Sequence, residues 1–263
     1  NFLDQKVEQI DYIIEKIKEV IEEYKKYKLS LITKTVTKGL NPDVKMKDSG
    51  IEWIGEIPEH WEVIKLKKLT TQIIDGTHAT PTYVDDGIPF LRVTDITDIN
   101  NILKDIDWDK TAKIPLEEHL ELIKRCKPEK GDLLVSKNGT IGVPRVIDWD
   151  HEFSIFVSLC LIKVNNSIDV NYLYYYFNSS LILMEIAIGG KTGTITNLHL
   201  EMIKEFLVPL PKKEEQYQIV DFLNDKCSII DNIIYQKERL LTEMESYKKS
   251  LIYEYVTGKK QVV

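Results

Sequence analysis

The sequence predicts an α+β protein in which one globular mixed α/β domain is flanked by two long α-helices able to form an antiparallel coiled coil. An internal repeat places two helical segments at residues 2–37 and 222–257. Between them, short β-like runs alternate with short helical patterns and are broken by Gly, Pro and Asn. The 263 residues are 43% hydrophobic and 29% charged, a globular composition that argues against a disordered or collagen-like chain.

The two copies of the repeat align without gaps at an offset of 220 residues. They share apolar positions and also polar ones, such as Asp11 with Asp231 and Ser30 with Ser250. Neither copy contains Gly or Pro before Gly39 or Gly258. Because Gly and Pro are the residues that interrupt helices, each copy is expected to form one long helix.

The apolar residues of each copy recur in steps of three and four, which is the spacing of a coiled-coil seam. A second set, including Ile13, Tyr27, Leu240 and Tyr247, widens the seam enough for more than one neighbour. About 30 helical residues span roughly 45 Å and would overhang a compact domain, which disfavours a helix lying on its own domain. The expected helix-pairing residues are Ile10, Ile14, Ile17, Ile21, Ile230, Ile234, Leu241 and Met244.

The middle of the chain is expected to be a single domain of normal size. Strand-like runs fall at residues 61–66, 88–93, 132–136, 142–147 and 153–164, and helical patterns at 116–125, 170–188 and 197–206. Asn197 is expected to begin the last of these helices. His119, among glutamates, is expected on a solvated helical face. The predicted divisions are residues 1–40, 41–210 and 211–263, each outer division holding one repeat helix.

Motifs of catalysis and of metal binding are absent from the sequence. Gly189-Gly190-Lys191-Thr192 is not a phosphate loop, because position 185 is Glu rather than Gly. The alternating Asp105, Asp107 and Asp109 are followed by Lys110 where a calcium loop needs Gly. We therefore expect a non-catalytic protein without metal or cofactor. Short apolar runs argue against a membrane protein, and three isolated cysteines favour the reducing cytoplasm.

Three polar loops of the middle domain carry side chains suited to nucleic acid, at residues 75–83, 136–145 and 189–194. Lys and Asn beside flexible Gly can present donors to phosphates or base edges. An ordinary turn is the alternative for each loop taken alone. The net charge of -7 opposes DNA binding, and residues 41–210 alone, with 18 Lys+Arg and 26 Asp+Glu, carry -8.

Several motifs in order resemble the DNA-specificity subunit of type I restriction–modification systems, often called HsdS. Near the start of the middle domain they are Ile54-Gly55-Glu56-Ile57-Pro58 and His60-Trp61-Glu62, then Asp75-Gly76-Thr77-His78 and Pro89-Phe90-Leu91-Arg92-Val93. Gly131-Asp132-Leu133-Leu134 and Gly139-Thr140-Ile141-Gly142 follow, and Val208-Pro209-Leu210-Pro211 with Glu214-Glu215-Gln216 precedes the second repeat helix.

The resemblance implies that the middle domain is a target recognition domain that reads one half of a bipartite site in double-stranded DNA. The helices would dock methyltransferase subunits, and restriction and translocase subunits would join through the complex. A chain with one recognition domain between two repeat helices corresponds to a half-subunit. Two such half-subunits would be expected to pair head-to-tail as a homodimer. Because the chain starts inside the repeat motif, it is expected to be the C-terminal half of a longer protein that carries an upstream recognition domain.

The expected DNA contacts are chosen by chemistry and loop position: Thr77, His78, Arg92, Lys137, Asn138, Thr140, Arg145, Lys191 and Thr192. The alternative function is a coiled-coil protein-interaction scaffold whose middle domain does not bind DNA, which would explain the acidity. If the middle domain does recognise DNA, its charge predicts weak, salt-sensitive binding by the isolated chain and a need for the methyltransferase partners.

Overall fold

The computed structural model describes residues 2–97, 106–189 and 197–259. The chain forms two compact units, one from residues 1–31 together with 222–263 and the other from residues 32–221. The two long helices, α1 (Phe2–Lys38) and α7 (Lys213–Val256), each contribute residues to both units. The predicted α+β class, with one mixed domain between two long helices, is confirmed.

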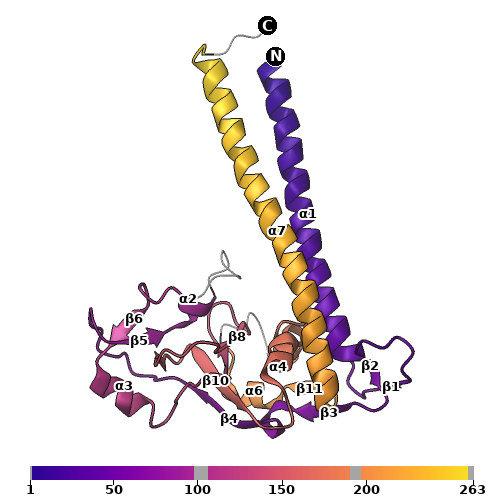
Figure 1. Ribbon diagram of the computed structural model, residues 1–263, viewed down its shortest axis with the longest axis vertical. Helices are drawn as coiled ribbons and strands as arrows, with labels where there is room; N and C mark the ends of the chain where they lie inside the picture. The colour runs from indigo at the N-terminus through magenta and orange to yellow at the C-terminus, as the bar shows by residue number, and fades with distance from the viewer. Residues whose placement is uncertain (1, 98–105, 190–196, 260–263) are drawn as a thin grey trace. The chain divides into compact units, whose positions relative to one another are not determined.

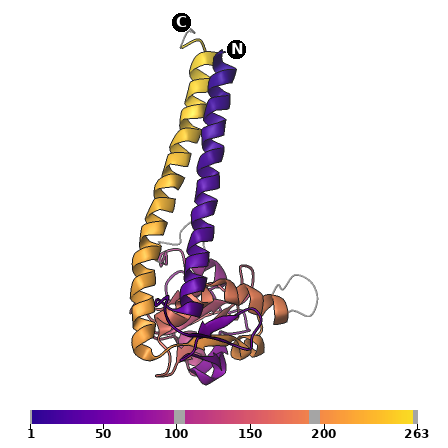
Figure 2. The same ribbon diagram turned by 90° about the vertical axis from the view of Figure 1, so that its right-hand side faces the viewer.

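In the first unit, α1 and α7 lie side by side and run in opposite directions (Figures 1 and 2). Ile10, Ile14 and Leu251 form a buried cluster, against which Leu3, Leu241, Met244 and Tyr255 pack. Ile17, Ile21 and Ile230 are also buried, and Ile234 is half-buried. All eight predicted helix-pairing residues therefore face away from solvent at least in part, as the seam spacing requires.

The second unit contains a four-stranded antiparallel sheet. Its strand order is β4 (Thr70–Asp75), β10 (Leu159–Val164), β7 (Leu133–Ser136) and β8 (Pro144–Val146). Every residue of β7 is buried, as are the first four of β10. This double-sided burial explains why their sequences are nearly continuous apolar runs rather than alternating patterns.

Smaller sheets complete this unit. β5 (Ile88–Leu91) pairs with β6 (Ala112–Ile114) and, in parallel, with β9 (Ser154–Ile155). Two further antiparallel pairs are β1 (Met46–Asp48) with β2 (Glu56–Pro58), and β3 (Glu62–Lys65) with β11 (Leu207–Leu210). The short helices are α2 (Val93–Ile96), α3 (Leu116–Leu122), α4 (Val170–Phe177), α5 (Ser180–Gly189) and α6 (Leu200–Glu205).

The predicted helix at 170–188 is two helices, α4 and α5. Ser179 Oγ donates to Tyr176 O at 2.6 Å and accepts from Leu181 N, while the Asn178 side chain donates to Tyr174 O. Short polar side chains of this kind compete with the helical backbone for hydrogen bonds and end the helix. The predicted strand at 153–164 is likewise two strands, β9 and β10, joined by a turn at 156–158.

Two further predictions were wrong. Asn197 does not begin α6, because it pairs with Asn138 in an isolated β-bridge and His199 stands at the N-cap instead. His119 is buried, with Nδ1 2.9 Å from Ser154 Oγ, rather than on a solvated face. Burial lowers the pKa of His119, because a low-dielectric environment disfavours the charged imidazolium.

Candidate nucleic-acid interface

One edge of the four-stranded sheet collects loops that are far apart in the sequence. β4 and β7 are each antiparallel to β10, so they run parallel to each other. Asp75, near the end of β4, and Val135, near the end of β7, both lie opposite Cys160. The loop that carries Thr77 and the loop that carries Asn138 therefore leave the sheet at the same edge.

The turn between β9 and β10 fastens these loops together. Thr77 N donates to Ile155 O at 3.1 Å, and Val157 N donates to Thr77 O at 2.9 Å. Lys137 N donates to Ser158 O at 2.8 Å. Val93 N, next to Arg92, donates to Ser158 Oγ at 3.1 Å. The loops after β4, β5 and β7 thus converge on one turn, and we call this region the β-edge.

Gly76 makes this convergence sterically feasible. A Cβ atom at position 76 would lie 1.9 Å from Ile155 O, a distance at which no side chain fits. The glycine of the Asp75-Gly76-Thr77-His78 motif therefore permits the close approach of two backbone segments. Thr77 Oγ1 then accepts a hydrogen bond from Ala79 N, which shapes the loop locally.

A buried ionic centre lies beneath the β-edge. Asp75 Oδ2 accepts from Lys137 Nζ at 2.6 Å, and Asp75 Oδ1 accepts from Arg125 Nη2 at 2.8 Å. Arg125 Nη1 also donates to the carbonyl oxygens of Asp75 and Gly76. Burial raises the pKa of Asp75, but the hydrogen bonds from Lys137 and Arg125 outweigh it and hold the net pKa below its usual value. Asp75 is therefore ionised at neutral pH.

The ionic centre occupies Lys137, which was one of the expected DNA contacts. Lys137 is only 5% exposed and its ammonium group binds Asp75, so it has no direct access to a phosphate in this structure. Its role here is to hold the loop after β7 against the end of β4. The Arg125 side chain is 51% exposed at the same place. Arg125 was not among the expected DNA contacts, although it lies in a basic cluster of the sequence.

The other predicted side chains at the β-edge differ in exposure. The His78 side chain is 70% exposed, with Nε2 3.3 Å from Asp75 Oδ2. Asn138 is half-buried and Thr140 is exposed, in the turn that joins β7 to β8. Arg92 Nε lies 3.7 Å from Asp95 Oδ2. Arg145, on β8, places its guanidinium 5.8 Å from the ring centroid of Trp149. Lys191 and Thr192 lie outside the described residues.

A cavity of about 370 Å³ opens beside the ionic centre. Thr77, His78, Arg125 and Ser154 contribute its polar lining, and Leu122, Cys126 and Ile155 contribute apolar atoms. Hydroxyl, imidazole and guanidinium groups together can donate to phosphate oxygens and to base edges. Glu121 also lines this cavity, so the local field is not purely positive.

The basic clusters of the sequence are mostly neutralised by nearby acids. Lys65 and Lys67 both bind Glu205, whose pKa their hydrogen bonds lower to about 2. Lys124 pairs with Glu121, Lys127 with Glu129 and Lys130 with Asp150. These pairs cancel most of the local positive charge of the clusters, so the clusters do not form an open basic surface.

The motifs at the two ends of the middle domain meet in the fold. Trp61 is completely buried and its Nε1 donates to Glu215 Oε2 at 2.9 Å, the oxygen that His60 Nε2 also approaches at 2.9 Å. Gln216, also fully buried, donates to Ser167 O and Pro211 O and accepts from Asp169 N. The Ile-Pro-Glu-His-Trp and Glu-Glu-Gln motifs thus stabilise one another.

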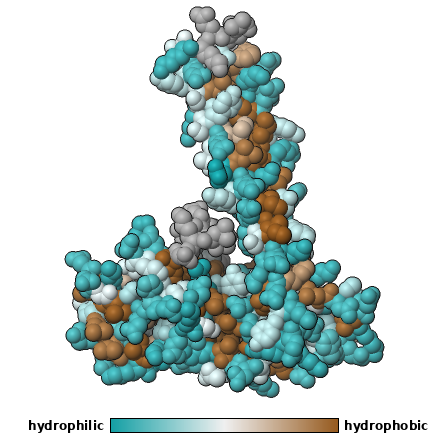
Figure 3. Space-filling view, viewed as in Figure 1, coloured by the Kyte–Doolittle hydropathy of each residue, from teal (hydrophilic) through white to brown (hydrophobic). Residues whose placement is uncertain are grey.

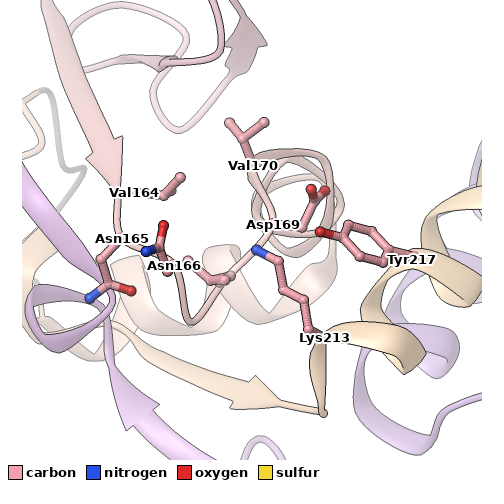
Figure 4. A pocket seen from close by; sticks show the side chains of 8 residues that line it. Val164, Asn165, Asn166, Asp169, Val170, Lys213 and Tyr217 are labelled. Atoms are coloured by element: carbon pink, nitrogen blue, oxygen red, sulfur yellow. The ribbon is translucent and has the colours of Figure 1, made fainter.

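The open depression beside this junction is a weaker candidate for a site. Lys213 and Tyr217 from α7 face Asn166 and Asp169 across it (Figure 4). Lys213 Nζ lies 5.7 Å from the Tyr217 ring centroid. Its lining comes from the structural junction rather than from the loops of the β-edge.

Metal-binding clusters, membrane-spanning helices and exposed thiols are absent from the described part of the chain. No group of three or more His, Cys, Asp or Glu residues there could hold a metal ion. No helix among the described residues is long and apolar enough to cross a membrane. Cys126, Cys160 and Cys227 are buried free thiols. Burial raises the pKa of Cys126 to about 11, which argues against a reactive thiolate.

Known proteins are similar to this chain in sequence and in fold. The specificity subunit of the type I restriction enzyme EcoBI from Escherichia coli is 28% identical over 66% of this chain and 36% of its own length. A Haemophilus influenzae protein named as a type I restriction enzyme specificity subunit is 34% identical over 50% of this chain and 32% of its own. The chain thus spans about a third of the curated relatives it matches.

Two solved structures share the fold at 17% identity. A chain from a study of complex assembly and conformational transition in the type I R-M system gives a TM-score of 0.65, over 96% of this chain and 57% of that one. The HsdS subunit from Thermoanaerobacter tengcongensis gives 0.53 over the same shares. The family model for the type I restriction modification DNA specificity domain matches residues 58–242, and the chain therefore belongs to this specificity-subunit family.

Proposed function

We propose that this chain is a sequence-specific DNA recognition subunit of a type I restriction–modification complex, and that residues 41–210 read one half of a bipartite site. One observation carries the proposal: the loops after β4, β5 and β7 converge on the β-edge, where backbone and side-chain groups of residues 155–158 hold them. A rigid platform with several polar side chains suits recognition of base edges, because direct readout requires precise placement in a groove.

The residues proposed to contact DNA are those that the β-edge presents to solvent. His78, Thr140 and the half-exposed Arg125 have the strongest geometric support. Thr77, Arg92, Asn138 and Arg145 lie in or beside the same loops, and Lys191 and Thr192 stay in the proposal on chemistry alone. Lys137 is proposed to position its loop through Asp75 rather than to touch DNA.

The paired helices are proposed to dock the methyltransferase subunits, and through them the restriction and translocase subunits. Apolar side chains remain on their outer surface: Ile13 is 44% exposed, Tyr27 57% and Tyr247 54%. Figure 3 shows hydrophobic residues along the paired helices. Helical partners recognise such heptad-spaced apolar positions. The chain itself is proposed to be non-catalytic and cytoplasmic, and half-subunits of this layout would pair head-to-tail.

A mobility-shift titration with the methyltransferase subunit tests the proposal. Duplex DNA carrying the site found by methylation mapping of the native complex should shift, while scrambled duplexes of the same length should require far more protein. Specific affinities usually exceed non-specific ones by roughly 10³-fold or more. Equal shifts with both duplexes would contradict the proposal.

The second candidate function is a protein-interaction scaffold. The acidity of residues 41–210, together with the exposed apolar residues of the helices, favours it. Tight protein partners combined with no shift of any duplex, in the presence of the methyltransferase subunit, would support the scaffold and exclude the recognition subunit.

A further inference from the structure

The internal repeat reappears in the ion pairs that join α1 to α7. Lys28 Nζ binds Asp231 at 2.6 Å, with both side chains largely buried. Lys248 binds Asp11 through the same ammonium–carboxylate contact, with side chains 28% and 50% exposed. At the repeat offset of 220, Asp11 corresponds to Asp231 and Lys28 to Lys248. The two ion pairs are therefore copies of each other, exchanged by the two-fold relation between the repeats.

A second set of ion pairs obeys the same exchange but with opposite signs. Lys18 Nζ lies 3.6 Å from Glu245, and Lys25 Nζ lies 4.0 Å from Glu238. At the same offset, Lys18 corresponds to Glu238 and Lys25 to Glu245. The first repeat helix is thus positive at both positions of this set, and the second repeat helix is negative at both.

We propose that these two sets form a pairing code in which each repeat helix accepts only the opposite repeat helix. The Asp–Lys set is the same in both copies, so it would form in any antiparallel pair of repeat helices. It therefore fixes the register of the pair but not the choice of partner. The Lys–Glu set is complementary only between unlike copies. Two first-copy helices would place Lys18 against Lys25, and two second-copy helices would place Glu238 against Glu245. Charges flanking a helical seam select partners in this way.

The apolar seam between the helices also disfavours a pair of two second-copy helices. Ile17 of the first copy is 8% exposed, whereas its counterpart in the second copy is the half-buried Lys237. Two second-copy helices would bring two lysines to the seam and no isoleucine, whereas the observed pair has one of each. Burying an ammonium group without a partner is costly, so this pairing is disfavoured by desolvation as well as by repulsion.

The partner that fits this surface is the opposite repeat helix, supplied by the same chain or by a second copy of it. A second copy would have to bind head-to-tail, with its second repeat helix on the first repeat helix of its neighbour. The inference does not depend on DNA recognition, because it uses only contacts between α1 and α7.

Charge-reversal variants of the full chain test the code. Lys18→Glu with Lys25→Glu reproduces the four charges of a second-copy homotypic pair, and Glu238→Lys with Glu245→Lys reproduces those of a first-copy pair. The quadruple variant exchanges all four and restores complementarity. Amide hydrogen exchange over residues 10–21 and 230–241, at low and high salt, measures the opening of the helix pair.

At low salt, each double variant should lose roughly tenfold in exchange protection, because two attractive pairs become repulsive. The quadruple variant should regain the original protection, and high salt should shrink the differences because it screens exposed charges. Lys26→Glu, an exposed reversal on the same helix, is the matched control and should change protection by less than about twofold.

A quadruple variant no better protected than the doubles would overturn the proposal, as would a loss of equal size at high salt or in Lys26→Glu. Sedimentation of the same samples identifies the source of the partner. Restored protection at the mass of one chain assigns the code to pairing within the chain, and restored protection at twice that mass assigns it to a second copy.

Discussion

At the scale of single residues, Asp75 decides the geometry of the β-edge. It is a nearly buried carboxylate whose two oxygens are divided between Lys137 and Arg125. Its cost of burial is offset only while both cations are present, since an unpaired buried charge is strongly destabilising. The same pairing withdraws Lys137 from solvent, which chemistry and loop position in the sequence could not indicate.

Lys137→Met should therefore lower the free energy of unfolding at neutral pH, by about 3 kcal/mol, because Asp75 loses one of its two partners. Asp75 stabilises the fold only when ionised. Its pKa is lowered in the folded state, so this stabilisation is complete above its ordinary pKa of 3.8 and is lost as pH falls below that value. The difference between the two proteins in urea unfolding should consequently stay constant down to that pH and shrink as the pH falls further.

The salt dependence of DNA binding separates the positioning role of Lys137 from direct contact. In the complex with methyltransferase subunits, Lys137→Met should leave the slope of log affinity against log salt unchanged, because no phosphate contact is lost. Arg92→Ala is the comparison, and its slope should fall by about one if Arg92 binds a phosphate. A reduced slope for Lys137→Met would place its ammonium group at the DNA.

Gly76→Ala should separate the loop after β4 from the turn between β9 and β10. The added methyl group would overlap Ile155 O, and relief requires backbone movement that costs about 1–3 kcal/mol. Gly139→Ala is the control: it meets no atom within 4 Å, although its φ of +67° adds strain. Thermal unfolding should show the larger loss for position 76, and equal losses would mean that the close approach is unimportant.

At the scale of elements, the long helices were predictable, whereas the ends of the short helices and the division between α4 and α5 were not. Helical periodicity over more than 30 residues averages out local exceptions, so α1 and α7 emerge from the repeat alone. The break between α4 and α5 depends instead on two side chains, Asn178 and Ser179, whose hydrogen bonds compete with the helix. Likewise, Asn197 looked like a helix cap because local patterns do not reveal its bridge to Asn138, which lies 59 positions earlier in the chain.

Ile14→Asp should break the helix pair, because Ile14 is 8% exposed in the cluster with Ile10 and Leu251. A carboxylate there stays unpaired or must bind a proton, at a cost of several kcal/mol. Ile13→Asp is the matched control, since the neighbouring side chain is 44% exposed. Hydrogen exchange of the unit formed by residues 1–31 and 222–263 should rise sharply for the first variant only. Similar rises in both would mean that the seam lies elsewhere.

At the scale of the whole molecule, the topology of the sheet brings the residues of the candidate interface together. Residues 77 and 138 lie in polar loops for which an ordinary turn was the alternative, and residue 92 lies at the end of a predicted strand. The sheet order brings them together, because β4 and β7 both flank β10. The net charge of -7 still opposes DNA binding in the folded protein, because acidic side chains pair with most members of the basic clusters.

The acidic members of these ion pairs are expected to limit the affinity for DNA, because they lie close to the proposed DNA contacts. Glu121 lines the cavity beside His78 and Arg125 and also holds Lys124. Glu121→Gln removes a negative charge near the proposed DNA contacts His78 and Arg125 and takes from Lys124 its charged partner. At low salt it should raise DNA affinity by about two- to threefold, the effect of one charge about 10 Å away in water. Glu23→Gln, an exposed change on α1, alters the net charge equally and is the control. If both variants gained the same affinity, total charge rather than the field at the β-edge would govern binding.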